Sequence, residues 1–412
     1  MTFGTVGMLH PSLAAMVDAI NAVMTREALH LRFAAAAVSF MQVCIEFVLK
    51  QRVNTMSVID SQLLNHFKRI HIFDSTSWDI DPNLRDVLPG SGGAASSANC
   101  KVQLCYEYLH GALSFFDIIP GNYPDNSYVT KLPALIGCGE LLIADLGYFC
   151  LKSLKSIAES SAYFIFRLLV GTNIYDASTM RPINLRCLLE KATGNAYQMD
   201  VVMGSQKQNQ VSCRLICLRV GDDIAEKRRR KLKQNAIRKG RPINELNQFM
   251  AGWTLMVTNV PREWLPPEMV RPLYMLRWQI ELLFKQFKSV LGIHKSVTGK
   301  EHRFRCELLG KLIVAILIHR IHADINIIFW NTKRQEISMN KLYKRIQERA
   351  FIMMGKLLTS LSEAIEYFAS ELIRLMKNCR KLKQKSRPSS LQSLDYKISS
   401  QSVQDMLSCD LT

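Results

Sequence analysis

The first 66 residues have the hydrophobic spacing of α-helices. Apolar side chains recur three and four positions apart, at Leu29, Phe33, Ala36, Ala37, Phe40 and Met41. That spacing places them on one face of a helix. The longest weakly polar stretch, Phe33–Ile45, is bounded by Arg32 and Glu46, and it is shorter than the roughly 20 apolar residues that cross a bilayer. We therefore expect helices with a buried face and no membrane-spanning segment.

Two short apolar segments that end in aspartate come next. Ile70 and Ile72 alternate with polar neighbours up to Asp74, and the apolar run Leu141–Ala144 ends at Asp145. Alternation and short apolar runs are typical of β-strands. If the two strands are neighbours in one sheet, both carboxylates emerge at the same edge.

The segment between these aspartates predicts a loop and a hairpin. Pro89–Asn99 is rich in Gly, Ser and Ala, which indicates a loop. Val102–Leu109 and Ala112–Ile119 then flank His110-Gly111. Two apolar segments around a short turn that contains glycine predict a β-hairpin.

Residues 151–261 read mostly as strands, and the rest of the chain as helix. The candidate strands are Ala162–Val170, Tyr197–Met203, Val211–Val220 and Trp253–Val257. Before the last of them lies Lys227–Arg241, with nine Lys and Arg among 15 residues. We expect this run to be a loop, and in most proteins such a loop is simply solvated. After Pro266-Pro267 the spacing is helical to about residue 385. A second basic run follows Arg374, and a Ser-rich tail begins at Ser386.

Composition narrows the function classes. The 412 residues are 48% hydrophobic, which supports a sizeable core and excludes wholesale disorder. A formal charge of +18 indicates a polyanionic partner, and without a membrane segment that partner is nucleic acid. The eleven cysteines include no Cys-x-x-Cys pair, so we expect reduced thiols and no zinc site. His319 and His322 have no third ligand nearby, and we expect them on a helix surface.

The segment 274–289 carries the most specific pattern. On a helix at 100° per residue, Tyr274, Arg277, Glu281 and Lys288 fall within about 60° of arc. Apolar residues occupy the adjacent arc, at Leu276, Ile280, Leu283, Phe284, Phe287 and Leu291. One flank therefore packs on a core while a stripe of phenol, cations and a carboxylate faces something polar. The alternative is an ordinary solvated helix face.

The spacing Tyr-x2-Arg-x3-Glu-x6-Lys resembles the YREK motif of the IS-four family of bacterial insertion-sequence transposases. Two further segments resemble the family's acidic motifs. The segment FDST places the first aspartate at Asp74, and the segment IADLGYF places the second at Asp145. Thr258-Asn259 also resembles the family's strand end. The resemblance covers about residues 67–320.

The resemblance implies an α/β fold, an RNase H-like catalytic core of a mixed sheet flanked by helices, interrupted by a β-strand insertion domain. The domains expected from it are 1–66 (helical, with truncation of a DNA-binding domain left open), 67–150 (first part of the core), 151–261 (insertion), 262–330 (catalytic helix) and 331–412 (helical, with a basic tail).

Three carboxylates, Asp74, Asp145 and Glu281, are implied as catalytic and metal-binding residues. Phosphodiester cleavage needs an activated water and a stabilised leaving oxygen, which two Mg²⁺ ions can supply. Magnesium prefers carboxylate oxygens, and Mn²⁺ is expected to substitute for it. The alternative for each aspartate alone is a turn or helix-capping residue.

The cations of the pattern are assigned to DNA. Arg277 and Lys288 are expected to hold phosphates near the cut, and the resemblance assigns Tyr274 to phosphate contact as well. Trp253 could stack on an extruded base, with a core tryptophan as the alternative. We also assign the centre of the basic run to the DNA backbone, at Arg228, Arg229, Arg230 and Lys231.

The leading hypothesis is a DDE transposase that binds the terminal inverted repeats of its element as a homodimer, cleaves there and joins the ends to a target duplex. It would act in the bacterial cytoplasm, at the nucleoid when bound to DNA. One alternative is an RNase H-like nuclease without strand transfer. Another is a degenerate transposase that binds DNA without catalysis. The sequence does not decide whether a hairpin intermediate forms.

Overall fold

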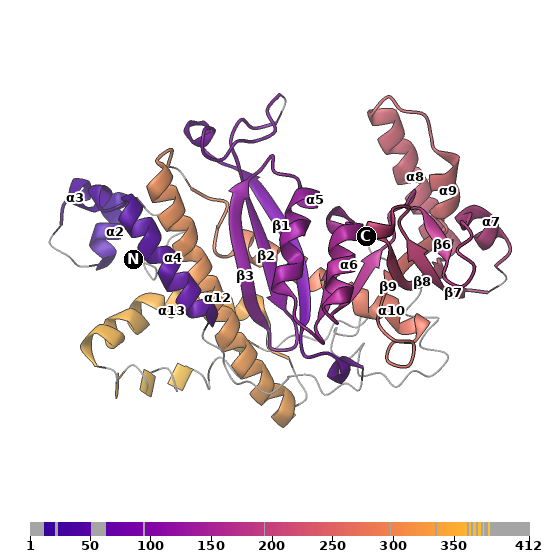
Figure 1. Ribbon diagram of the computed structural model, residues 1–412. Coiled ribbons are helices and arrows are strands. Elements are labelled where there is room, and N and C mark those ends of the chain that lie inside the picture. The colour runs from indigo at the N-terminus through magenta and orange to yellow at the C-terminus, as the bar shows by residue number, and fades with distance from the viewer. Residues whose placement is uncertain are drawn as a thin grey trace. The chain divides into compact units, whose positions relative to one another are not determined.

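The computed structural model describes residues 12–20, 24–50, 63–93, 95–192, 194–296, 298–333, 336–360 and scattered residues between 362 and 379. The predicted basic tail from residue 380 onward lies outside these ranges. The chain divides into two compact units (Figure 1). Unit 1 comprises Met1–Val58, Asp74–Pro124 and Gln279–Ser386, and unit 2 comprises Ile59–Phe73, Asp125–Trp278 and Arg387–Thr412.

Unit 2 is built on a mixed sheet in the order β1-β4-β5-β9-β8-β7-β6. Its strands are β1 (Ile70–Asp79, which continues into unit 1), β4 (Leu141–Ala144), β5 (Tyr163–Arg167), β6 (Ile174–Asp176), β7 (Ala196–Met203), β8 (Val211–Arg219) and β9 (Trp253–Thr258). The strands β1, β4 and β5 are parallel, and the pairs from β5 onward are antiparallel. Together with the helices, this sheet confirms the predicted α/β class.

The central strands of unit 2 are apolar because both of their faces are covered. Every residue of β4 and of β9 is buried, although successive side chains point to opposite faces of a sheet. The helices α6 (Leu151–Glu159) and α10 (Pro267–Tyr274) pack against the strands. A strand covered on both sides reads as a continuous apolar run, which is why the sequence located β4 correctly.

The remaining helical elements of unit 2 are short except for α8. They are η1 (Leu64–His66), α5 (Asp125–Tyr128), η3 (Val129–Leu135), η4 (Leu146–Tyr148), α7 (Leu185–Glu190), η5 (Lys207–Asn209), α8 (Asp222–Arg238), α9 (Glu245–Met250) and η6 (Met275–Arg277). The following helix, α11 (Trp278–Ser289), begins in unit 2 and continues in unit 1.

The basic run is a helix, and our prediction of a loop was wrong. Asp222 and Asp223 lie in the first turn of α8, where acidic groups suit the helix dipole. At the other end Gly240 has a φ of +57°, and the N–H of Arg241 donates to the Ala236 carbonyl at 3.0 Å. This is a glycine-terminated helix end. The cations misled the prediction because these end signals lie outside the densest part of the charge run.

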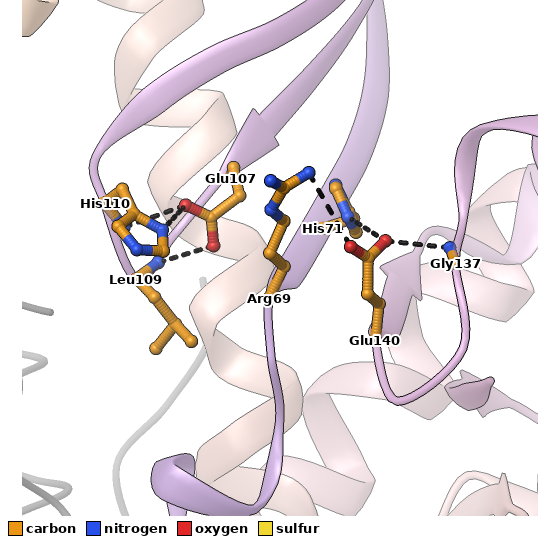
Figure 2. Close-up of polar contacts among 7 residues, drawn as sticks. All are labelled: Arg69, His71, Glu107, Leu109, His110, Gly137 and Glu140. Carbon is orange, nitrogen blue, oxygen red and sulfur yellow. Dashed lines mark hydrogen bonds and ion pairs between the residues drawn. The ribbon is translucent and has the colours of Figure 1, made fainter. Parts of the chain in front are cut away.

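Unit 1 contains the hairpin of β2 (Asn99–Glu107) and β3 (Ala112–Pro120), with β2 next to β1. Glu107 organises its turn, because its carboxylate accepts the N–H groups of Leu109 at 3.0 Å and of His110 at 2.8 Å (Figure 2). Gly111 follows with a φ of +64°, which glycine adopts without strain. The predicted hairpin is confirmed.

The other elements of unit 1 are helical, apart from its part of β1. They are α2 (Leu13–Ile20), α3 (Arg26–Leu31), α4 (Ala35–Lys50), η2 (Pro82–Leu84), most of α11, α12 (Glu301–Lys333) and α13 (Met339–Thr359). The helix α12 packs on α4 and on β3. In α4 the buried face carries Val38, Met41 and Ile45, whereas Phe40 is 67% exposed and not on the buried face as predicted. In the described part of the chain no helix meets the length and hydropathy needed to span a membrane.

The start of β1 is fastened to the start of β4 by a partly buried ion pair within unit 2 (Figure 2). Glu140 accepts a hydrogen bond from the backbone N–H of Gly137 at 2.8 Å, and it contacts the His71 Nε2 at 2.9 Å and the Arg69 guanidinium at 3.6 Å. Burial raises the pKa of Glu140, but these hydrogen bonds and charges outweigh it and lower that pKa to about 2. The charged carboxylate is therefore more stable in the folded chain than in the unfolded chain.

Replacing Glu140 by Gln should lower the free energy of unfolding by about 1–2 kcal/mol at pH 7. Because the folded pKa lies below the unfolded value of 4.5, this contribution is present above pH 4.5 and is lost as the pH falls toward 2. Urea unfolding of both proteins at pH 7 and pH 3 measures the difference. A difference that stays constant between the two pH values would contradict the ion-pair explanation.

A histidine expected on a helix surface is buried in unit 1. His319 on α12 is surrounded by the rings of Tyr106, Phe287 and Tyr343 at centroid distances of 5.8–6.1 Å. Neither ring nitrogen has a hydrogen-bond partner among the described residues. Burial, with the nearby charge of His322 acting in the same direction, lowers the pKa of His319 to about 3. The folded chain therefore holds this side chain neutral.

We expect His319→Phe to raise the free energy of unfolding by about 1 kcal/mol at pH 7, because it removes buried polar atoms that lack partners. The folded pKa lies below the unfolded value of 6.5, so the wild-type chain loses stability as the pH falls below 6.5. The variant should not show this loss. Denaturation curves at pH 7 and pH 5 test the prediction. The prediction is overturned if the difference in free energy of unfolding between variant and wild type is smaller at pH 5 than at pH 7.

Candidate active site

The two aspartates follow directly on a pair of strand partners. In unit 2, β1 and β4 run parallel from the pair Ile70–Leu141 to the pair Phe73–Ala144. Asp74 is the residue after Phe73, and Asp145 is the residue after Ala144. Asp74 lies within β1, which excludes the helix-cap alternative for it. Its Oδ1 accepts the N–H of Ser75 at 2.8 Å.

Asp145 presents its carboxylate outward from the end of β4. It precedes the 3₁₀ turn η4, but its side chain makes no capping hydrogen bond there. The turn alternative therefore does not explain the carboxylate. The side chain is 45% exposed, and its Oδ1 lies 3.9 Å from the Nε of Arg277. An exposed carboxylate beside an arginine can bind a cation or a polar substrate.

The segment that supplies Arg277 is not the continuous α-helix predicted over 274–289. The helix α10 ends at Tyr274, η6 forms a 3₁₀ turn, and α11 begins at Trp278. A 3₁₀ turn has three residues per turn where an α-helix has 3.6, so three such residues add about 60° of rotation. Tyr274 is consequently only 7% exposed and does not share an open stripe with the other three residues.

The buried hydroxyl of Tyr274 still lies within the electrostatic field of this site. Burial raises the pKa of Tyr274 to about 12, and the negative charge of Asp145 acts in the same direction. The positive charges of Arg277 and Arg167 act in the opposite direction. Tyr274, Asp145 and these two arginines therefore form one electrostatic group in unit 2.

Arg167 is a member of this group that our sequence analysis missed. In the parallel pair β4–β5, Ile143 is the partner of Ile165. Asp145 and Arg167 each lie two residues further along their strands, so they are level with each other at the same end. Arg167 is exposed. The signal was a charge directly after an apolar run, but the predicted strand Ala162–Val170 placed that charge in a strand interior.

The dipeptide Thr258-Asn259 fastens the end of β9 to the start of β5, which is the opposite end of β5 from Arg167. The Thr258 hydroxyl donates to the Phe164 carbonyl at 2.7 Å. The Asn259 side chain accepts the Phe164 N–H at 2.8 Å and donates to the Ala162 carbonyl at 2.8 Å. Nearby, Arg214 donates to the Leu265 carbonyl at 2.7 Å. These bonds hold the connection from β9 to α10, which carries Tyr274.

Glu281 and Lys288 belong to unit 1. Glu281 lies in the first turn of α11, whose predicted apolar residues Ile280, Leu283, Phe284 and Phe287 are all buried. The Lys288 ammonium donates to the Ser77 carbonyl at 3.1 Å and lies 6.0 Å from the centre of the Trp78 ring. Burial lowers the pKa of Lys288. Lys288 thus anchors α11 to the same strand that carries Asp74.

The carboxylates suit a divalent metal by their chemistry. Asp74, Asp145 and Glu281 offer oxygen ligands, which Mg²⁺ and Mn²⁺ prefer. Asp74 and Glu281 belong to unit 1 and Asp145 to unit 2. Among the described residues, no three His, Cys, Asp or Glu side chains are grouped closely enough to hold a metal ion. The three-carboxylate site therefore stays a prediction.

Trp253 and part of the basic run have internal contacts. The Trp253 side chain is 6% exposed and lies under the Arg219 guanidinium at 5.2 Å, which favours the core alternative over base stacking. Arg228 donates to the Trp253 carbonyl at 3.1 Å, and Arg229 donates to the Gln248 carbonyl at 3.3 Å. Arg230 and Lys231 are exposed. Only the last two present their charge to solvent.

Comparison with known proteins identifies the family of this chain. Residues 65–317 match the family model of the transposase DDE domain. The transposase for insertion sequence element IS231F of Bacillus thuringiensis subsp. israelensis is 33% identical over 347 residues, which cover 80% of this chain and 72% of that protein. The transposase for insertion sequence element IS1151 of Clostridium perfringens is 31% identical over 350 residues, covering 80% of this chain and 73% of that protein.

A solved piggyBac transposase synaptic complex with hairpin DNA has a TM-score of 0.43 and 11% sequence identity, over 94% of this chain and 77% of that chain. That likeness is too distant to carry an argument. The DDE domain implies dependence on divalent metal in general, and transposases act on DNA. The chain therefore belongs to the DDE transposase family, among the transposases of bacterial insertion sequences.

Proposed function

We propose that this chain cleaves DNA at the terminal inverted repeats of its own element and joins the freed 3′-hydroxyls to a target duplex. Asp74, Asp145 and Glu281 are the proposed catalytic carboxylates. Two copies of the chain act together, one for each end of the element, in the bacterial cytoplasm where the DNA lies.

The observation that carries this proposal is the parallel register of β1 and β4. Phe73 and Ala144 are partners, and the aspartates are the next residue on each strand. Neighbouring strands lie about 4.8 Å apart. Each aspartate is one peptide bond beyond a register pair, and this supports the proposal that Asp74 and Asp145 act in one site.

Neighbouring carboxylates repel each other unless a cation lies between them. In the proposed site Asp74, Asp145 and Glu281 would hold Mg²⁺, or Mn²⁺ in its place. When bound, such ions supply an activated water and neutralise charge on the leaving oxygen. Glu281 lies in the first turn of α11, and Lys288 fastens this helix to β1 through the Ser77 carbonyl.

The arginines hold the phosphate that is cut. Arg167 and Arg277 both follow Asp145 in sequence, and the positive charges of both lower the pKa of Tyr274. Guanidinium groups bind phosphate oxygens with a fork of two N–H donors. In this proposal they orient the scissile phosphate and offset its negative charge, while Tyr274 packs beneath them. Lys288 has a structural contact in unit 1, so we assign it to positioning α11 as well as to DNA.

Replacing Asp145 by Asn should abolish cleavage, by about 100-fold or more, and leave DNA affinity within about threefold, because affinity rests on cations. The cleavage rate is measured in single-turnover assays on a duplex with the element's terminal repeat. The DNA affinity is measured with Ca²⁺ in place of Mg²⁺. Glu190→Gln is the matched control, since Glu190 is an exposed carboxylate paired with Arg186 at 2.9 Å. Normal cleavage by Asp145→Asn would refute the assignment.

A sulfur ligand tests the role in metal binding directly. Asp145→Cys should be inactive with Mg²⁺ and regain part of its activity with Mn²⁺, which accepts softer ligands more readily. Glu190→Cys should behave as wild type with both ions. Adding a second duplex and assaying for joined products separates transposition from the alternative of a nuclease, which would leave the 3′-hydroxyl ends unjoined.

Arg277→Lys keeps the charge but removes the guanidinium fork beside Asp145. We expect cleavage to fall by about 10- to 100-fold while affinity changes little, because the fork orients the phosphate in the reacting state. Arg167→Lys should show the same pattern more weakly, since Arg167 is exposed. Arg186→Lys is the control. If affinity falls in proportion to cleavage, Arg277 is one more cation of a binding surface and has no orienting role.

A further inference from the structure

The helix α8 is an exposed basic helix at the edge of unit 2. It extends beyond the strands of that unit, with α9 beside it (Figure 1). Its 17 residues span about 25 Å at 1.5 Å per residue. Its contacts with the body of unit 2 are concentrated near its N-terminus, where Ile224 and Ala225 pack on Val220.

Two arginines fix the helix in place. Arg228 donates to the Trp253 carbonyl at 3.1 Å and to the Thr254 hydroxyl at 3.2 Å, which are both on β9. Arg229 donates to the Gln248 carbonyl on α9 at 3.3 Å. Charge-assisted bonds from two successive residues give α8 a defined orientation. The helix is thus a fixed projection, presented to solvent along one side.

The opposite side of α8 carries an ordered set of exposed side chains. Successive residues are 100° apart, so Lys231, Gln234 and Arg238 form one stripe along the helix, three and four positions apart. Ile237 lies about 60° from Gln234 on one side of this stripe, and Lys233 lies about 40° further round on the same side. Lys231, Lys233 and Gln234 have no hydrogen bond or ion pair within the part of the chain that the structure describes, and Arg230 pairs with Glu226 at 2.6 Å.

Two members of this surface are not cations. Gln234 is exposed in the middle of the stripe, and Ile237 beside it is 77% exposed. A helix that only attracted phosphates would gain nothing from an amide and a bare aliphatic side chain. In the major groove of DNA, Gln pairs with adenine N6 and N7, and apolar groups contact the thymine methyl. Gln234 and Ile237 together match an A·T-containing step.

We propose that α8 enters the major groove of duplex DNA and reads its sequence through Gln234 and Ile237, while Lys231, Lys233 and Arg238 bind the flanking phosphates. The groove is about 12 Å wide and admits an α-helix of about 10–12 Å diameter. This inference deepens the proposed function and rests on it, because it names double-stranded DNA of preferred sequence as the partner of α8.

The test is a binding selection with the full chain and a pool of randomised duplexes, in Ca²⁺ so that no strand is cut. The wild-type chain should enrich a motif, and the Gln234→Ala/Ile237→Ala variant should lose preference at two to four adjacent A·T-containing positions. Its ratio of motif to random affinity should fall by about 10-fold or more. Ile352→Ala, which removes an exposed isoleucine of α13, is the control and should keep the whole motif.

Two further measurements separate base reading from charge. Lys231→Ala and Lys233→Ala should weaken motif and random duplexes equally and make the salt dependence shallower. Replacing thymine by uracil at the lost positions should weaken the wild-type chain but leave Ile237→Ala unaffected.

The proposal is overturned if the double variant enriches the wild-type motif, if it loses motif and random affinity equally, or if the wild-type chain enriches no motif. Failure of the proposed function would appear differently, as wild-type protein that binds its terminal-repeat duplex but does not cut it with Mg²⁺. Thermal unfolding of each variant checks that α8 stays folded.

Discussion

The parallel pairing of β1 with β4 is the constraint on which the rest of the structure depends. Four partner pairs, from Ile70–Leu141 to Phe73–Ala144, fix the register of two strands that are far apart in sequence. The Glu140 ion pair with Arg69 and His71 fastens one end of this pairing. At the other end each strand continues into an aspartate. Because side chains alternate with a period of two, a slip of one residue would turn one aspartate to the opposite face.

Arginine performs two different tasks in this protein, and the partner of each guanidinium separates them. Arg214, Arg228 and Arg229 donate to backbone carbonyls and so hold β8, β9, α9 and the segment before α10 in place. Arg167, Arg230 and Arg277 keep part of their surface open to solvent or to a carboxylate. A basic composition is therefore an imperfect measure of DNA-binding surface. Part of the charge of +18 is used inside the fold.

The same division applies to the motif around Tyr274. Its members share a spacing in sequence, yet Tyr274 is buried, Arg277 contacts Asp145, and Lys288 donates to a carbonyl of β1. Arg277 thus lies beside a carboxylate of the proposed site, whereas Lys288 fastens α11 to β1. Tyr274 serves as a buried support whose hydroxyl lies in the field of the charged groups, and the 3₁₀ turn after it gives the segment this arrangement.

The sequence by itself determined the local elements whose pattern has one interpretation. Three predictions are confirmed: the apolar run of β4, the glycine turn of the hairpin β2–β3 and the apolar arc of α11. Each has a local pattern in the sequence. A strand buried on both faces is apolar throughout, a turn with positive φ contains glycine, and a helix with one buried face has a helical period. The prediction that a strand ends at Asp74 was wrong, because β1 continues to Asp79, whereas Asp145 does follow the end of β4. The α/β class followed from the same elements and from the resemblance.

Only the tertiary structure decided which charges face solvent and which bind the fold. The basic run proved to be the helix α8, which contacts within unit 2 hold in place through Arg228 and Arg229. His319 proved to be buried, because the rings around it come from distant segments. Arg167 became a candidate through the register of β4 with β5, which no single segment contains. Pairing between strands and contacts across helices depend on residues far apart in sequence, and a local pattern carries no record of them.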